Sequence, residues 1–348
     1  MIHFHDLDRP PSLHRHEDLA RYLASGPNRP HLVSSVELAE MSETERNTYD
    51  RQRVIYLSGG IVLNTPDLIA AQKLLVSTFA QNAGRNSGHA GLMITGPSTI
   101  GKTTTAKALM RFVHDQYVRQ VAPSGMNNRI PVMYVEVPAG STAKLLMRTF
   151  AEFLGLSIRS GESTGAIRAR VVSALTAART QLIVVDEVHN LAGRTAGIGE
   201  SVDLLKGLHN DVPATFLYAG IDLTRGELME GPRGRQIAGR FATLQLNPLH
   251  HGVEADRRTW GGLINAFEKE LLLSEHVLGT LAREARYLWE RTGGSIGSLG
   301  RLLTGAAIEA ITNPNLRETI NRELLEGGRI DHHAEDAFGR GLWVESFA

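Results

Sequence analysis

The sequence contains no cysteine, no long apolar run and no excess of charge of either sign. Without cysteine, the chain has no disulfide, no thiol nucleophile and no thiolate metal ligand. No apolar run approaches the ~20 residues that span a bilayer, and the first residues lack the apolar segment of a signal peptide. We therefore expect a soluble, cytoplasmic protein with no membrane partner. Because 37 basic residues balance 37 acidic ones, any surface that binds nucleic acid must be local.

The 14 histidines raise the question of a metal centre. The densest groups lie near the two ends of the sequence, at His3, His5, His14, His16, His332 and His333. None of them has a recognised ligand spacing with carboxylates on one helix face, so the sequence favours surface histidines.

Residues 91–104 read as an apolar strand, a tight turn bounded by glycine and the first turn of a helix. The turn and the helix start are formed by Gly96, Pro97, Ser98, Thr99, Ile100, Gly101, Lys102, Thr103 and Thr104. Successive backbone N–H groups at the positive end of a helix bind anions, and glycine lets the backbone approach phosphate oxygens closely. We expect a nucleotide here, with Lys102 on its β- and γ-phosphates and the Thr103 hydroxyl on Mg²⁺. The alternative is a strand-to-helix turn without a ligand.

A second apolar run, residues 181–185, ends in two carboxylates, Asp186 and Glu187. A run of this length is typical of a buried parallel strand, and the carboxyl end of such a strand faces the ligand. Asp186 suits the Mg²⁺ that bridges the phosphates, and Glu187 is placed to deprotonate the attacking water. A kinase does not need the second acid, so the pair favours hydrolysis. Two acids in a solvated loop are the alternative.

Alternating strand and helix signals predict an α/β fold. We expect strands at residues 91–95, 131–137, 181–186, 214–220 and 241–246, and helices at 102–117, 141–154 and 164–179. Five strands separated by helices imply a parallel sheet covered on both faces. Ahead of the sheet, the sequence predicts an extended arm, a helix over residues 35–53 and another helix that starts after the cap residue Thr65.

The strand signal disappears after Pro248. Apolar residues at helical spacing predict three helices, over residues 260–271, 277–288 and 299–310. We divide the chain into an arm with lead-in helices (1–85), a nucleotide-binding core (86–247), a helical lid (248–312) and a polar tail (313–348). An apolar cluster near the end of the tail is either a strap on its own domain or a partner-binding segment; it contains Leu342, Trp343, Val344 and Phe347.

The two motifs and the helical lid resemble the AAA+ type of P-loop NTPase. Within that class, the chain is similar to transposition regulators of the TniB/TnsC kind over about residues 50–310. The finer resemblance rests on residues 64–66, Gly220, residues 238–241 and residues 293–296. It implies that Arg240 is the arginine finger that completes a neighbour's site, with Arg233 and Arg235 as rivals.

Two positions depart from the family pattern. Only Asp222 lies near the sensor position that follows the fourth strand, and Gly297 stands where the lid of such proteins commonly carries an arginine. The nearest lid arginine is Arg301, one helical turn further on. These departures favour slow hydrolysis that DNA or a partner stimulates.

The resemblance implies an Mg²⁺-dependent ATPase that assembles into a ring or filament on double-stranded DNA and recruits or regulates a transposase or targeting protein. ATP rather than GTP follows from the resemblance and from the lack of a guanine-specific motif. The alternatives are a nucleotide-gated switch with negligible hydrolysis, and a helicase loader or replication initiator.

In a neutral chain, a DNA surface must come from a few cations that are repeated along an assembly. Lys144 and Arg148 after the second strand, and Arg194 after the Asp-Glu pair, are phosphate-binding types that would bind without reading sequence. Alternatively, Lys144 and Arg148 only form the solvated side of their helix. In that case we expect the DNA-binding surface on the N-terminal arm, which contains Arg9, Arg15 and Arg21.

Overall fold

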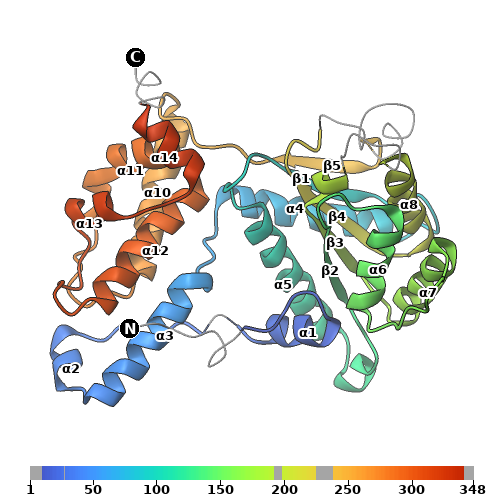
Figure 1. Ribbon diagram of the computed structural model, residues 1–348, viewed down its shortest axis with the longest axis horizontal. Helices are drawn as coiled ribbons and strands as arrows, with labels where there is room; N and C mark the ends of the chain where they lie inside the picture. Colours follow the sequence, from blue (N-terminus) through green and yellow to red (C-terminus); the bar gives the residue numbers. More distant parts are fainter. Residues whose placement is uncertain (1–9, 27, 192–197, 225–237, 341–348) are drawn as a thin grey trace.

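The protein, a computed structural model, is described here for residues 10–26, 28–191, 198–224 and 238–340. Its centre is a parallel sheet with the strand order β2-β3-β4-β1-β5 (Figure 1). The strands are β1 (Gly91–Thr95), β2 (Val132–Glu136), β3 (Leu182–Asp186), β4 (Thr215–Gly220) and β5 (Phe241–Gln245). The predicted α/β fold with five parallel strands is confirmed.

The register of the strands brings their carboxyl ends to one edge of the sheet. β4 lies between β1 and β3, and Thr95 at the end of β1 is level with Gly220 at the end of β4. Every residue of β1, β3 and β4 is buried, which explains why these strands read as continuous apolar runs. The segments that follow β1, β3 and β4 therefore meet at this edge.

Helices cover both faces of the sheet (Figure 1). On one side lie α4 (Pro66–Asn82) and α5 (Lys102–Gln120), and on the other α6 (Ala143–Phe153), α7 (Thr164–Ala177) and α8 (Ile198–Asp211). As predicted, Thr65 caps α4, because its hydroxyl accepts a hydrogen bond from the backbone N–H of Leu68 at 3.1 Å. A further helix, α1 (His16–Ala24), packs against α5 and β2.

A second hydrophobic cluster holds the C-terminal helices together. These helices, called the lid below, are α10 (Glu254–Glu270), α11 (Ala285–Thr292), α12 (Ile296–Thr312), α13 (Arg322–Gly327) and α14 (His332–Gly339). The first three correspond to the helices predicted for the lid. The last two were not predicted, because residues 313–340 were interpreted as a polar tail. Leu325 and Ala337 are buried in this segment, so it packs as part of the lid.

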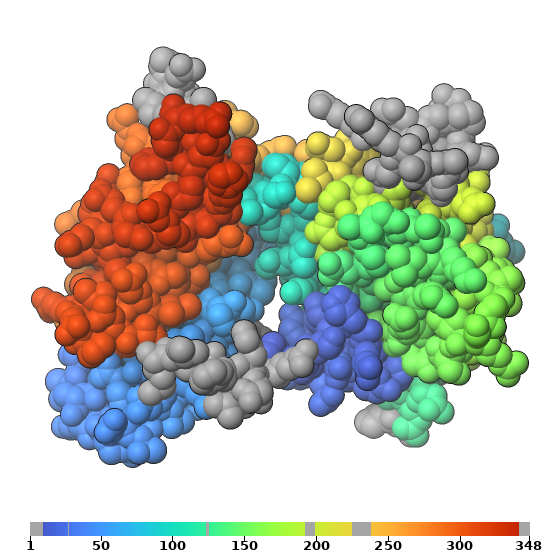
Figure 2. All heavy atoms as spheres, viewed as in Figure 1, coloured from blue at the N-terminus to red at the C-terminus, as the bar shows by residue number. Residues whose placement is uncertain are grey.

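The N-terminal helix α3 (Glu43–Gly59) belongs with the lid and not with the sheet, and in the space-filling view its blue segment lies against the orange and red lid helices (Figure 2). Its Arg53 is fully buried and donates to both carboxylate oxygens of Glu318, at 2.7 and 2.9 Å. Two parallel hydrogen bonds of this kind fix the direction of both side chains as well as their distance. This ion pair therefore ties residues far apart in the sequence into one unit.

Four other features differ from the sequence predictions. The arm contains α1 instead of being extended throughout, and the helix predicted over residues 35–53 is two helices, α2 (Ser35–Glu40) and α3. The break has a local cause, since Ser42 and Glu45 form a reciprocal capping box that starts α3. Val277 lies outside any helix, and α11 begins only at Ala285. Helix α8 was not predicted.

The predicted domain boundary at residue 85, between the lead-in helices and the nucleotide-binding core, stays a prediction. The packing of the helices favours a different boundary. Leu23 of α1 and Leu75 of α4 belong to the cluster around the sheet, whereas Leu57 of α3 belongs to the lid cluster. We therefore propose a core that includes α1 and α4, and a lid that includes α3. No helix in the described ranges is long and apolar enough to cross a membrane.

Candidate nucleotide-binding site

Two glycines give the turn after β1 backbone angles that other residues rarely adopt. Gly96 (φ 154°) and Gly101 (φ 92°) lie in the region that favours glycine, and Gly101 directly precedes α5. A Cβ atom at Gly96 would stand 2.4 Å from the carbonyl oxygen of Leu246 at the end of β5. This glycine therefore lets the turn pack closely against the sheet.

Lys102 lies inside this turn. Its side chain is 7% exposed, and its Nζ donates to the carbonyl oxygens of Gly96 at 3.0 Å and Pro97 at 2.6 Å. Burial lowers the pKa of Lys102, and the carboxylates of Glu187, Asp186 and Asp222 partly oppose that effect. Among the described residues, the hydrogen-bond partners of the ammonium group are thus two neutral carbonyls, and an anionic phosphate would bind it more strongly.

Asp186 connects the two predicted motifs. One of its oxygens, Oδ2, accepts hydrogen bonds from the hydroxyls of Thr103 at 2.9 Å and Tyr134 at 3.1 Å. The other oxygen accepts the backbone N–H of Glu187 at 2.9 Å, and the residue is 1% exposed. Hydroxyl and carboxylate oxygens at this separation are ligand types that suit Mg²⁺. Thr103 and Asp186 are thus the residues that could hold the ion.

Tyr134 was not among the predicted site residues. Burial raises the pKa of its phenol, and the nearby carboxylate of Asp186 raises it further. The hydroxyl therefore remains protonated and donates to Asp186 near neutral pH. The only signal in the sequence is an aromatic residue in an otherwise aliphatic strand.

Glu187 follows Asp186 and has a positive φ of 55°. Such an angle is uncommon for a residue with a side chain and disfavoured by about 1–3 kcal/mol, so contacts around it must hold it in place. Its side chain is one-third exposed, and Oε2 lies 3.2 Å from Nε2 of His189. Asp222, the candidate sensor residue after β4, also has a positive φ of 47°.

The lid touches the turn after β1 through the start of α12. The carbonyl oxygen of Thr99 accepts the backbone N–H of Gly297 and the hydroxyl of Ser295, each at 2.8 Å. A Cβ atom at Gly297 would stand 2.0 Å from the same oxygen. The contact therefore excludes any side chain at position 297. This explains why the chain has a glycine at the lid position where the family resemblance implied an arginine.

Arg240 lies at the opposite edge of the sheet. Its carbonyl oxygen accepts the N–H of Gly91 at the start of β1, and its guanidinium donates to Asn210 at 2.8 Å. The five residues of β1 separate that edge from the turn by about 15 Å. Arg240 is thus not brought together with Lys102 or Glu187 within one chain. Arg194, Arg233 and Arg235 lie outside the described residues.

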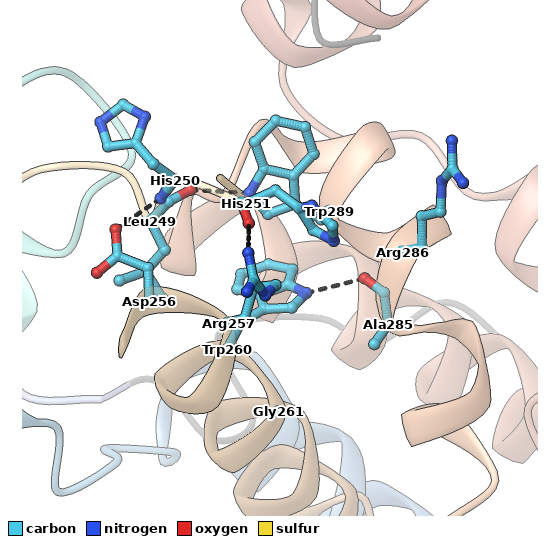
Figure 3. Close-up of a pocket in the computed structure, with 10 residues that line it drawn as sticks. All are labelled: Leu249, His250, His251, Asp256, Arg257, Trp260, Gly261, Ala285, Arg286 and Trp289. Carbon is cyan, nitrogen blue, oxygen red and sulfur yellow. Dashed lines mark hydrogen bonds between the residues drawn. The ribbon is translucent and has the colours of Figure 1, made fainter. Parts of the chain in front are cut away.

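A cavity of about 140 Å³ opens between α10 and α11 (Figure 3). In the close-up, Trp260 donates to the carbonyl of Ala285 at 2.9 Å, and Trp289 donates to that of Leu249 at 2.8 Å. None of the predicted site residues lines this cavity. We therefore place the candidate site at the turn after β1.

Four features together define the AAA+ ATPase class. They are a glycine-bounded turn after β1, an acidic pair at the end of β3, the strand β4 between β1 and β3, and a helical lid. Residues 68–251, more than half of the chain, match the family described as "Bacterial TniB protein". The chain therefore belongs to the TniB family, as its motifs predicted. No curated protein sequence matches it.

Three solved structures have the same fold. The ORC1 protein of Aeropyrum pernix, solved in complex with DNA, is 17% identical with a TM-score of 0.59, covering 83% of this chain and 69% of that one. The ORC2 protein of the same organism, solved with ADPNP and ADP, is 17% identical with a TM-score of 0.55, covering 82% and 74%. Cdc6p from Pyrobaculum aerophilum is 14% identical with a TM-score of 0.54, covering 76% and 67%. At these identities the likeness concerns the fold.

Proposed function

We propose that this protein is an Mg²⁺-dependent ATPase that assembles on DNA and regulates a transposase. One observation carries the nucleotide part: the hydroxyl of Thr103 and the carboxylate of Asp186 are in contact beside the buried cation of Lys102. Binding of a metal–triphosphate requires a hydroxyl and a carboxylate for the metal ion and an ammonium group for the phosphates.

Each residue has a defined task in this proposal. Lys102 exchanges its two carbonyl partners for β- and γ-phosphate oxygens, and Glu187 accepts the proton of the attacking water. Mg²⁺, when bound by Thr103 and Asp186, neutralises charge on the phosphates. Arg240 acts on the nucleotide of a neighbouring subunit, because the sheet separates it from its own turn.

The nucleotide part is tested by titration calorimetry with Lys102→Ala. Loss of a charged hydrogen-bond donor corresponds to about 1.5–3 kcal/mol, so we expect ATP to bind about 10- to 150-fold more weakly. Lys107→Ala on the same helix is the matched control and should bind like the parent. An unchanged affinity in a folded Lys102→Ala protein would exclude the turn as the ATP site.

The DNA part is supported by membership of the TniB family and by the solvent side of α6. Lys144 and Arg148 are exposed there, one turn apart, and neither forms an ion pair with any residue in the described ranges. Repetition of these cations along a ring or filament would produce a basic track on a chain with no net charge. The identity of the regulated partner, a transposase or targeting protein, rests on the family alone.

Filter binding at several salt concentrations tests this surface. We expect binding to double-stranded DNA that requires ATP and shows little sequence preference. Removing both charges, with Lys144→Ala and Arg148→Ala, should flatten the salt dependence by roughly one unit per lost phosphate contact. Arg258→Ala in the lid is the control. An unaltered salt slope would move the DNA surface elsewhere, first to Arg15 and Arg21.

One observation favours the second candidate, a nucleotide-gated switch. The lid contacts the turn through the backbone of Gly297, so it offers no arginine at that position to stabilise the transferring phosphate. Tight ATP binding with negligible turnover, even with DNA present, would support the switch. An initiator or helicase loader stays a third alternative, and ATP-dependent co-purification with a transposase would argue against it.

A further inference from the structure

His189 lies between the end of β4 and the proposed catalytic carboxylate. It belongs to the short helix η2 (Val188–Leu191) that follows Glu187. Its Nδ1 accepts the backbone N–H of Ile221 at 3.3 Å, while its Nε2 lies 3.2 Å from Oε2 of Glu187. The ring therefore has one partner on each side.

These two contacts determine where the proton of a neutral ring lies. A neutral imidazole has one N–H and one acceptor nitrogen. Because Nδ1 of His189 accepts from Ile221, the N–H must be on Nε2, which faces Glu187. The backbone at the end of β4 thus puts the N–H of a neutral His189 on Nε2, the ring nitrogen that lies 3.2 Å from one oxygen of Glu187.

The residue at the end of β4 fits this arrangement. A Cβ atom at Gly220 would stand 3.2 Å from Nδ1 of His189, 3.2 Å from its backbone nitrogen and 2.9 Å from the side chain of Leu223. Glycine therefore leaves the room that the ring needs to reach Ile221.

We propose that His189 is a positioning residue that holds the Glu187 carboxylate and couples it to the end of β4. The inference rests on the proposed ATP hydrolysis, in which Glu187 takes the proton from water. In this arrangement His189 holds Oε2, and Oε1 is the oxygen that would accept the proton of the water. His189 does not contact the reacting atoms, and it acts through Glu187.

Two substitutions separate the two sides of the ring. In His189→Gln, the amide nitrogen can occupy the place of Nε2 and still donate to Glu187. In His189→Asn, the shorter amide reaches only the place of Nδ1. General-base catalysis contributes about 100- to 10,000-fold, so losing the alignment of the base should lower kcat by about 10- to 100-fold in His189→Asn. His189→Gln should restore kcat to within about threefold of the parent, and neither change should alter the affinity for ATP.

A double-mutant comparison shows whether the effect passes through Glu187. If it does, adding His189→Asn to Glu187→Gln causes no further loss of turnover, because the aligned group is already absent. Losses that multiply would overturn the proposal, as would a His189→Asn protein with parental kcat. Gly220→Ala, which crowds the ring from β4, should reproduce the loss seen with His189→Asn.

The tautomer can be measured without any turnover. Long-range ¹H–¹⁵N spectra of histidine-labelled protein, assigned by loss of one signal in His189→Asn, should show a neutral His189 protonated on Nε2. Protonation on Nδ1 would overturn the inference even if ATP is hydrolysed. A parent protein that shows the Nε2–H form but hydrolyses no ATP would instead contradict the proposed function.

Discussion

The contact between the lid and the turn after β1 gives a prediction with a matched control. Gly297 and Gly305 both lie in α12, but a Cβ atom at Gly297 would stand 2.0 Å from the carbonyl oxygen of Thr99, whereas nothing lies within 4 Å of one at Gly305. Replacing each by alanine adds the same methyl group to the same helix. Only the surroundings differ.

The expected effects have opposite signs. Alanine is favoured over glycine inside a helix by about 0.5–1 kcal/mol, so Gly305→Ala should stabilise the lid by that amount. Gly297→Ala gains the same helix preference, but the added methyl group breaks two hydrogen bonds to Thr99. Each of these bonds contributes about 0.5–1.5 kcal/mol net to stability. We expect a net loss of about 0.5–2 kcal/mol for Gly297→Ala, and weaker ATP binding because α12 no longer rests on the turn.

Tryptophan fluorescence during urea unfolding measures this difference. Trp260 and Trp289, two of the three tryptophans in the sequence, are buried in the lid and report on that unit. The midpoint should fall for Gly297→Ala and rise for Gly305→Ala. Two variants with the same midpoint and the same ATP affinity would refute the contact between α12 and the turn.

Two further predictions concern the edge of the sheet near Arg240. Burial lowers the pKa of His209 to about 4, with smaller effects of Arg240 and His89. The unfolded chain then binds a proton from about pH 6.5 downward and the folded chain only near pH 4, so stability falls on acidification, by about 2 kcal/mol between pH 7 and pH 5 from this group. Urea unfolding at both values should show a smaller fall for His209→Gln, and an equal fall would contradict the assignment. For Arg240, mixing Arg240→Ala with Lys102→Ala subunits should recover part of the ATPase activity, because one interface then combines an intact turn with an intact finger. No recovery at any ratio, with both proteins folded, would shift the role to Arg233 or Arg235.

The parts of the fold that were predictable have local causes. The residues of the turn after β1 are neighbours in sequence, and the buried strands are mostly apolar, so their pattern does not depend on distant contacts. The break between α2 and α3 also had a local signal, since a serine followed three residues later by glutamate marks a helix start. Helix α8 had one too, with Val202, Leu205 and Leu208 at helical spacing.

The features that could not be predicted depend on contacts between distant segments. Tyr134 meets Asp186 only because β2 and β3 are adjacent in the sheet, and Gly297 meets Thr99 only because the lid packs over the turn. Likewise, His189 gains a defined proton position from a backbone group of the neighbouring strand. Sequence spacing specifies none of these pairs, because each is set by strand order and by packing between units.

The most direct test of the central claim is the ATP turnover of Glu187→Gln. The substitution keeps the size of the side chain and removes the base. We expect unchanged ATP affinity by calorimetry, turnover lowered by about 100-fold or more, and assemblies that persist with bound ATP. Turnover equal to that of the parent, with ATP still bound, would contradict the account, because hydrolysis would then depend on a group other than the carboxylate at the end of β3.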